Sequence, residues 1–455
     1  MKEIIKPLKK LPEKIRLGGD YNITQYALLL GLLAKNDISI RNYNRGKDTS
    51  LTISFLNSVG GVVERSATEI LVRGDSRIQI DDCAELEYKG GAVPLAMIIG
   101  FLAGKKTCCS LVYSNKINPD LIDFLVGYFN KYSIDIFHRA ETNQIYFRAG
   151  SESPVECTLS NALPYLKDSL LIYSLTCGQS ILIKEKAATD SGFEKLITDL
   201  GGALSCEETK SVMTTDPDDP RKRIRVDSYD YKRKIFLKKS SEIGGGELNV
   251  PSDFNSLAAF LLLAILKKEK LTIENAYIKD SMGRFLKFLK TFAAEVGSGN
   301  RKTVGNYTVY DISIDGHEAK GRKLSGRTAT GLMELIPFIT IAAAVGNGNT
   351  VIRDVSEYGV WRNNPFHEIS VALGRLGIKS GALEDGLVIE GKPDYEDDSF
   401  GPFDNRETAL AFYMLTLSET VKTTFDGFEL VGDNYPEIVE EVQAAYERQL
   451  LSRSA

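Results

Sequence analysis

The sequence predicts an α/β protein built from repeated helix-and-strand units, and three observations support this. Six segments are apolar at nearly every position for about three helical turns. Amphipathic helices that end in small residues and lead into strands lie between them. The two kinds of segment alternate along the chain as a unit of roughly 70 residues that appears six times. Repeats of this length usually are stacked supersecondary units that share one core.

The first apolar segment, GGDYNITQYALLLGLLAKNDISIRN from Gly18 to Asn42, shows the pattern most clearly. It contains a glycine turn, an apolar helix, a short polar break and a strand. A surface helix would carry a single apolar stripe, so a helix that is apolar all round must be covered on most sides. The sequence therefore predicts six core helices, the other five beginning near Gly90, Leu163, Ser252, Met333 and Arg406.

The second kind of segment is amphipathic and precedes a further strand. Copies begin at Leu51, Leu121, Phe193, Phe285 and Glu368, and YPEIVEEVQAAYE forms the last helix. The pairs Gly60-Gly61 and Gly201-Gly202, and the single Gly377, fall where a helix C-cap needs a positive φ.

Length and composition limit the class of protein. A chain of 455 residues is too long for one core and predicts two or three domains. A hydrophobic content of 43% and a charged content of 26% are typical of a soluble globular protein. The net charge of -5 argues against nucleic acid as a partner.

The cysteines, the histidines and the start of the chain predict a reduced, cytoplasmic protein without a metal or other cofactor. Six cysteines in so long a chain do not form a disulfide scaffold, and adjacent Cys108 and Cys109 on a predicted strand point to opposite faces. The start MKEIIKPLKKLPEK is not a signal peptide, and no apolar run approaches the length of a membrane span. No histidine has zinc-ligand spacing, and His367 is interpreted as a capping or surface residue.

Residues 221–239 form a basic segment in which Lys and Arg alternate with apolar residues. This pattern predicts a hairpin with one cationic face. Its usual meaning is a solvated sheet edge protected by charge. The alternatives are a substitute anion site, or a patch for an acidic protein partner or nucleic acid.

The repeats resemble the EPSP synthase family of 3-phosphoshikimate 1-carboxyvinyltransferases, the enolpyruvyltransferases of aromatic biosynthesis. The opening glycine turn with Asp20, its apolar helix and RGKDTSLTISFLNSVGGVVE look like the start of that family. LNVPSDFNSLAAFLL, GLMELIPFITIAAAVGNGNTVIRD and DNRETALAF with NYPEIVEEV are similar to its fourth, fifth and sixth repeats.

The resemblance implies a two-domain enolpyruvyltransferase fold, an inside-out α/β barrel of six βαβαββ repeats with three in each domain. Residues 21–244 would form the upper domain, and residues 1–20 with 245–455 the lower one. The core helices would point their N-termini at the gap between the domains, where their partial charges and free N–H groups attract anions. The implied partner is a small anionic ligand in that interdomain cleft.

The family's ligand-binding motifs are altered in this chain. The first motif has Tyr21, Asn22 and Tyr26 where the family has Lys, Ser and Arg. The second repeat has Ala96 at an Arg position. In the third repeat Tyr165 replaces a polar residue, Lys167 keeps a charge nearby, and Asp190 is interpreted as a helix cap.

The fifth and sixth repeats keep more of the family pattern. Glu334 occupies the position of the catalytic Asp and is predicted to act as general acid or base, with helix capping as its alternative role. Asp404 and Arg406 match the family's Asp-His-Arg. The predicted catalytic residue is thus Glu334, and the predicted ligand-binding residues are Tyr21, Asn22, Tyr26, Tyr165, Lys167, Arg362, Asp404 and Arg406.

The cationic residues of the family that are missing from this chain would weaken the binding of phosphorylated ligands. Charge-assisted hydrogen bonds contribute about 1.5 to 3 kcal/mol each, so losing four or five costs on the order of 5 to 10 kcal/mol of binding. We therefore expect an EPSP-synthase-like protein with a degenerate site that acts on or binds a different small metabolite. The alternatives are an inactive binding or regulatory homologue, a genuine carboxyvinyltransferase, and a nucleotide-end enzyme such as RNA 3′-phosphate cyclase, whose nucleophilic His is not found. The aromatic replacements indicate either a cleft packed shut or a pocket that stacks a flat ligand.

Overall fold

The structure is a computed structural model of the 455-residue chain. It describes residues 2–74, 78–148, 155–160, 164–186, 188–189, 191–209, 211–215, 223–227, 231–356, 358, 365–391, 399, 401–418 and 424–454.

All six predicted core helices are present and buried. Every residue of the fifth is buried, and so is every residue of the sixth after Arg406. Burial on all sides explains why no apolar stripe is visible in these segments. The core helices are α1 (Tyr21–Gly31), α3 (Ala92–Gly104), α5 (Pro164–Cys177), α7 (Phe254–Lys267), α10 (Ile336–Ala344) and α13 (Arg406–Leu417).

The predicted amphipathic helices are also present. One face is buried in each well-described case; in α8 the buried face includes Met282, Phe285 and Leu289. Gly60, Gly201 and Gly377 have φ values of 90°, 93° and 70°, which confirms the predicted C-caps. The amphipathic helices are α2 (Lys47–Ser58), α4 (Pro119–Lys131), α6 (Phe193–Asp199), α8 (Asp280–Phe292), α12 (Pro365–Arg375) and α15 (Pro436–Ser454). Shorter helical segments are η1 (Ala140–Thr142), α9 (Gly326–Thr330), η2 (Met333–Leu335) and α14 (Phe428–Asn434).

Five four-stranded sheets, counted within the described residues, share one topology. In the second repeat the first two strands are parallel, and the last strand lies antiparallel between the second and third. With α3 and α4 as connections, this gives the chain order βαβαββ. The strands of this sheet are β6 (Ala84–Tyr88), β7 (Cys109–Tyr113), β8 (Ile136–Arg139) and β9 (Gln144–Phe147).

The third and fifth repeats have the same strand order. The third contains β10 (Val155–Leu159), β11 (Ile181–Glu185), β12 (Leu204–Glu208) and β15 (Arg233–Leu237). The fifth contains β20 (Lys323–Leu324), β21 (Gly348–Ile352), β22 (Ser380–Leu383) and β23 (Gly386–Gly391).

The first and fourth repeats take one strand from a distant part of the chain. The N-terminal strand β2 pairs in parallel with β17, and β16 lies beside β3. The fourth sheet contains β2 (Lys14–Arg16), β17 (Lys270–Tyr277), β18 (Ala294–Val304) and β19 (Tyr307–Gly316). The first contains β3 (Ile38–Arg41), β4 (Val63–Arg65), β5 (Glu69–Val72) and β16 (Gly246–Asn249). In the described part of the sixth repeat, the strand β24 (Thr424–Asp426) pairs antiparallel with the N-terminal strand β1 (Lys2–Ile4).

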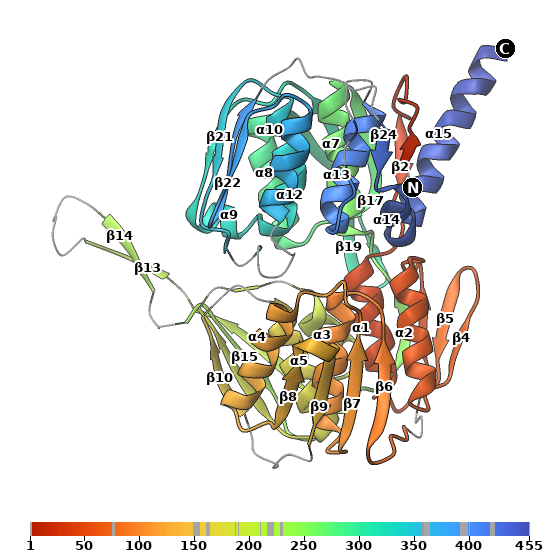
Figure 1. Cartoon of the computed structure of the whole chain (residues 1–455), viewed down its shortest axis with the longest axis vertical. Coiled ribbons are helices and arrows are strands. Elements are labelled where there is room, and N and C mark those ends of the chain that lie inside the picture. The colour runs from red at the N-terminus through yellow and green to blue at the C-terminus, as the bar shows by residue number, and fades with distance from the viewer. Residues whose placement is uncertain are drawn as a thin grey trace. The chain divides into compact units, whose positions relative to one another are not determined.

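The chain forms two compact units. Unit 1 contains residues 1–24, 41–50 and 248–455, and Unit 2 contains residues 25–40 and 51–247. In Unit 1 the core helices α7, α10 and α13 pack together, and in Unit 2 α3 packs against α5 (Figure 1). The predicted domain limits stay a prediction, and the two units differ from them at residues 21–24, 41–50 and 245–247.

The hairpin predicted within residues 221–239 is wrong. The strand β14 (Arg223–Asp227) pairs with β13 (Ser211–Thr215), and the two form a separate hairpin (Figure 1). The following strand β15 lies between β11 and β12, so it is not a solvated edge. Its residues Ile235 and Leu237 are buried in the core. Alternating charged and apolar residues predict strands correctly but do not specify which strand is the partner.

None of the helices within the described residues has both the length and the apolar character needed to cross a membrane.

Candidate functional site

The first element of the candidate site is a pair of carboxylates at the heads of α1 and α7 in Unit 1. Asp20 Oδ1 accepts from the N–H of Ile23 in its own helix at 2.9 Å, and its Oδ2 accepts from the N–H of Phe254 at 3.3 Å. Asp253 Oδ1 accepts from the Ser256 N–H at 2.7 Å, and its Oδ2 from the Tyr21 N–H at 3.1 Å. Each carboxylate thus caps both helices. These N–H groups already donate to the protein, whereas free N–H groups at a helix N-terminus would attract an anion.

Burial and proximity change the proton affinity of this pair. Burial, together with the neighbouring Asp253, raises the pKa of Asp20 to about 6, although Lys279 acts in the opposite direction. Two carboxylates that share one small space favour protonation of one of them.

Glu334, the predicted catalytic residue, lies in the η2 turn just before α10 and pairs with Lys279. The Lys279 Nζ is 3.4 Å from Glu334 Oε2 and 3.9 Å from the centroid of the Phe254 ring. The Lys279 side chain is nearly buried, whereas Glu334 is partly exposed. Sequence reasoning missed Lys279; the available signal was its position between β17 and the first residue of α8.

Arg406, the best preserved basic residue, is surrounded by groups of this chain in Unit 1. Its guanidinium carbon is 3.7 Å from the centroid of the Tyr21 ring. Its Nε donates to Glu407 Oε1 at 3.0 Å, and its Nη1 is 4.0 Å from Asp48 Oδ2. The Tyr21 hydroxyl donates to the same Asp48 oxygen at 2.6 Å. Burial disfavours the charged guanidinium, but Glu407, Tyr21 and Asp48 outweigh it and hold the pKa of Arg406 above its ordinary value.

The head of α13 is capped by a side chain. Asn405 Oδ1 accepts from the Thr408 N–H at 2.7 Å, while the preceding Asp404 is exposed. Two asparagines at the heads of the neighbouring core helices, Asn22 and Asn255, each have a buried carbonyl oxygen without a hydrogen-bond partner among the described residues. The amide nitrogen of Asn255 lies 3.5 Å from Glu407 Oε1, beside Arg406.

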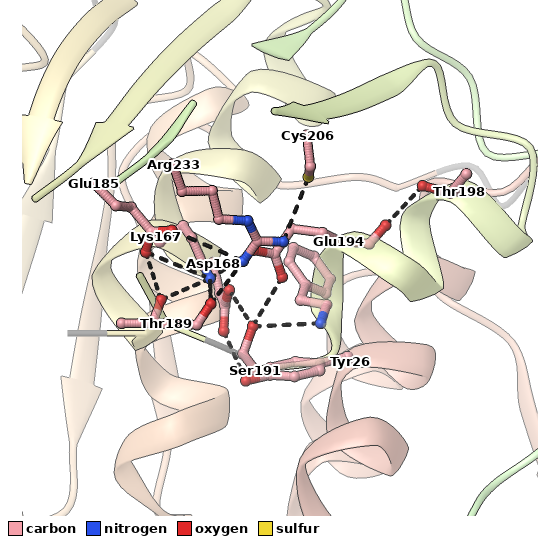
Figure 2. A network of polar contacts seen from close by, with 11 residues as sticks. Tyr26, Lys167, Asp168, Glu185, Thr189, Ser191, Glu194, Thr198, Cys206 and Arg233 are labelled. Carbon is pink, nitrogen blue, oxygen red and sulfur yellow. Dashed lines mark hydrogen bonds and ion pairs between the residues drawn. The ribbon is translucent and has the colours of Figure 1, made fainter. Parts of the chain in front are cut away.

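Unit 2 contains a second polar network around the fully buried Lys167 (Figure 2). The Lys167 Nζ is 2.6 Å from Glu194 Oε1 and 3.7 Å from Glu185 Oε1. It also donates to Thr189 Oγ1 at 2.7 Å. Burial opposes the charge, but Glu194 and Glu185 raise the pKa of Lys167 above its ordinary value. The charge predicted to hold a ligand is therefore already balanced within the protein.

Arg233 on β15 also joins this network. Its Nη1 is 3.2 Å from Glu194 Oε1 and donates to the Thr189 carbonyl at 2.7 Å, and its Nη2 contacts the Cys206 sulfur (Figure 2). Burial alone would raise the pKa of Glu194, but Lys167 and Arg233 hold it below its ordinary value.

Tyr26, another predicted binding residue, points into the same network. Its hydroxyl donates to Asp168 Oδ2 at 2.7 Å, and Ser191 donates to Asp168 Oδ1 at 2.8 Å. Burial raises the pKa of Asp168 to about 7, although Lys167 and these two hydrogen bonds oppose the shift. Tyr26 is completely buried and serves as a donor to the protein itself.

The remaining predicted positions are less informative. Tyr165 lies in the first turn of α5 and is 5% exposed. Arg362 and Asp190 lie outside the described residues. Metal-binding groups of three or more His, Cys, Asp or Glu side chains do not occur within the described part of the chain.

The Unit 1 cluster is acidic as a whole. Its side chains include two cations, Lys279 and Arg406, and five carboxylates, namely Asp20, Asp48, Asp253, Glu334 and Glu407. Such a cluster can hold one carboxylate of a ligand at Arg406, hydroxyl groups at the asparagine oxygens, and an acid or base at Glu334.

Comparison with known proteins shows which family this chain resembles over most of its length. The family model for EPSP synthase (3-phosphoshikimate 1-carboxyvinyltransferase) matches residues 5–228 and 221–442. The 3-phosphoshikimate 1-carboxyvinyltransferase of Petrotoga mobilis is 24% identical over 447 residues, covering 97% of this chain and 98% of that protein. The corresponding protein of Thermoanaerobacter sp. (strain X514) is 23% identical over 435 residues, covering 95% and 97%.

Solved structures show the same fold. EPSP synthase from Acinetobacter baumannii aligns with a TM-score of 0.74 and 19% identity, covering 98% of this chain and 97% of that one. The enolpyruvyl transferase NikO from Streptomyces tendae aligns with a TM-score of 0.72 and 13% identity, covering 96% of each chain. The predicted enolpyruvyltransferase fold is confirmed, and the chain belongs to the EPSP synthase family.

Proposed function

We propose that this chain is a divergent member of its family that binds a small hydroxylated ligand carrying one carboxylate at the Unit 1 cluster. In this proposal the chain does not join phosphoenolpyruvate to 3-phosphoshikimate. The observation that supports it most is the neutralisation of Arg406 by Glu407 and Asp48, at 3.0 and 4.0 Å. A phosphorylated ligand would have to compete with these two carboxylates for the same guanidinium.

The helix heads support the same choice of ligand. Asp20 and Asp253 already occupy the N–H groups of α1 and α7, and Asn405 caps α13. A second negative charge brought to these heads would meet like charges, which costs free energy at low dielectric. A ligand with a single carboxylate also competes with Glu407 and Asp48 for Arg406, but it brings one negative charge to the cluster where a phosphorylated ligand brings more.

The unpaired amide oxygens of Asn22 and Asn255 specify the rest of the ligand. A buried carbonyl oxygen without a donor costs about 1 to 3 kcal/mol, so a ligand hydroxyl that donates to it recovers that free energy. Asn22 directly follows Tyr21, which stacks on Arg406, and Asn255 contacts Glu407. A hydroxyl donor beside a carboxylate therefore matches Asn255 and Arg406, which both contact Glu407.

Glu334 is the group that would transfer a proton if the bound ligand reacts. Lys279 fixes the carboxylate from one side, and the partial exposure of Glu334 leaves it accessible to a ligand. A positioned carboxylate of this kind is suited to general acid or base catalysis.

Two other functions are each favoured by one observation. A silent binding or regulatory homologue is favoured by Lys167, which lies at a predicted ligand position but is buried in ion pairs of the protein. A genuine carboxyvinyltransferase is favoured by the similarity to the 3-phosphoshikimate 1-carboxyvinyltransferases of Petrotoga mobilis and Thermoanaerobacter sp..

The proposal is tested by calorimetric titration with shikimate, 3-phosphoshikimate and phosphoenolpyruvate. We expect shikimate, a hydroxylated monocarboxylate, to bind at least as tightly as its phosphorylated form. The variant Arg406→Gln should weaken shikimate binding about tenfold or more, since a lost charge-assisted contact exceeds 1.4 kcal/mol. The matched control is Arg45→Gln, because Arg45 also pairs with carboxylates in Unit 1, at Glu437 and Glu440.

The outcome that would overturn the proposal is equally specific. If 3-phosphoshikimate bound about tenfold more tightly than shikimate, a phosphate would be held by cations, contrary to the acidic character of the cluster.

A further inference from the structure

Two exposed cysteines lie side by side at one end of the second-repeat sheet in Unit 2. Cys83 ends the turn before β6, and Cys108 directly precedes β7. The Cys83 N–H donates to the Cys108 carbonyl oxygen at 2.6 Å, and the next residues, Ala84 and Cys109, are a parallel in-register pair. Both side chains are exposed free thiols.

The backbone geometry suits a cross-strand disulfide. Neighbouring strands lie about 4.7–4.9 Å apart, and a disulfide requires a Cα separation of about 4.4–6.8 Å. Cys83 has a φ of 67°, a left-handed conformation that is uncommon for a side-chain-bearing residue, and the Ala84 N–H closes the turn onto Asp81 at 3.0 Å. The turn thus holds Cys83 against the strand that follows Cys108.

We propose that Cys83 and Cys108 form a reversible disulfide when a small-molecule disulfide such as oxidised glutathione acts on the protein. One cysteine thiolate attacks the small disulfide and releases one small thiol. The second cysteine thiolate then attacks the mixed disulfide and releases the other. The two protein sulfurs lose two electrons and two protons in total, and the small disulfide gains them as two thiols.

The other cysteines are poor competitors for this reaction. Burial raises the pKa of Cys109 to about 11 and that of Cys157 to about 12, so their thiolates are scarce. Burial also raises the pKa of Cys177 and Cys206. Cys206 is an exposed cysteine outside the proposed pair, and its sulfur contacts Arg233. It therefore serves as the control for the substitution of an exposed cysteine.

The bond would close the segment that contains β6 and the core helix α3. A closed loop lowers the entropy of the unfolded chain, so oxidation should stabilise the second repeat. In a reducing compartment such a bond forms only transiently, as in redox-responsive proteins. This inference concerns Unit 2 and does not depend on the ligand proposed for Unit 1.

The test is treatment of the whole protein with oxidised glutathione, followed by intact mass and peptide mapping without reduction. We expect the mass to fall by two hydrogen atoms and a cross-linked peptide pair to contain Cys83 and Cys108. The melting temperature should rise by several degrees and return after dithiothreitol. Cys83→Ser and Cys108→Ser should each abolish both changes, whereas Cys206→Ser should keep them.

Two results would overturn the proposal. One is glutathione retained as mixed disulfides on both Cys83 and Cys108 without a cross-link. The other is a cross-link that persists in Cys83→Ser and therefore joins different cysteines.

Discussion

Asp20 and Asp253 each accept a hydrogen bond from the helix that the other begins. Phe254 donates to Asp20 and Tyr21 donates to Asp253, so two repeats that are distant in sequence share one pair of caps. The backbone segments around them are also joined, since the Asp20 N–H donates to the Pro251 carbonyl and the Asp253 N–H to the Gly18 carbonyl, each at 2.8 Å. The shared caps fix the heads of α1 and α7 in Unit 1 without a bound anion.

We predict that Asp253→Ala costs more than the loss of a single helix cap. The substitution removes hydrogen bonds from the Ser256 N–H, the Ser256 hydroxyl and the Tyr21 N–H. We expect a loss of about 2 to 4 kcal/mol in the free energy of unfolding, measured by calorimetry. Asn118→Ala, which removes one exposed cap bond to Asp120, is the control and should cost about 1 kcal/mol. Equal losses in the two variants would contradict the shared-cap interpretation.

Stability should fall as the pH rises from about 4 to about 7. Burial raises the pKa of Asp20 to about 6 and that of Asp168 to about 7 in the folded protein, above their unfolded value of 3.8. Within this window the folded state binds more protons than the unfolded state, so deprotonation favours unfolding. The stabilisation from these two groups is complete below the unfolded pKa and is lost as the pH passes the folded pKa values.

The two aspartates can be separated by substitution. Asp20→Asn should reduce the dependence of the melting temperature on pH mainly between pH 4 and about 6. Asp168→Asn should reduce this dependence up to a pH of about 7. Asp135→Asn is the control and should leave the slope in place, because this exposed carboxylate in Unit 2 pairs with Arg148, which stays charged across the range. A slope unchanged by either buried substitution would show that other groups determine it.

The sequence predicted those features of the fold and site that depend on residues close together in the chain, and it did not predict partners that are distant in the chain. The core helices were predicted because α10 and α13 are apolar on every side, and the C-cap glycines because Gly60 and Gly201 follow amphipathic helices. The partner of β15 was not predicted, since alternation at Ile235 and Leu237 fits any neighbouring strand. The partner of Lys167 was also not predicted, because Glu194 lies on another helix and only folding brings the charges together.

We predict that Lys167→Met is strongly destabilising because it leaves Glu194 and Glu185 with less positive charge in a buried environment. Removing one partner of a buried ion pair costs about 3 to 5 kcal/mol. The exposed pair of Lys184 and Glu156 offers a control, and Lys184→Met should cost less than about 1 kcal/mol. The double variant Lys167→Met with Glu194→Gln should recover part of the loss in a calorimetric cycle. If Lys167→Met matched its control, the ammonium would not be held by these carboxylates.

We predict that the Tyr21 ring and its hydroxyl each contribute to holding Arg406. Tyr21→Phe keeps the ring under the guanidinium and removes only the hydrogen bond to Asp48, so it should cost about 1 kcal/mol of stability. Tyr21→Leu also removes the cation–π contact, which adds about 0.5 to 2 kcal/mol. Thermal unfolding of both variants measures the difference, and identical melting temperatures would show that the stacking contributes nothing.

The most direct test of the proposed function is release of inorganic phosphate from phosphoenolpyruvate in the presence of 3-phosphoshikimate. The positive control is the EPSP synthase of Acinetobacter baumannii, assayed beside this protein. Because Arg406 and Lys167 are already neutralised by carboxylates of the chain, we predict release no faster than without protein. Release within about tenfold of the control rate, lost in Glu334→Gln, would contradict the proposal and establish a working carboxyvinyltransferase.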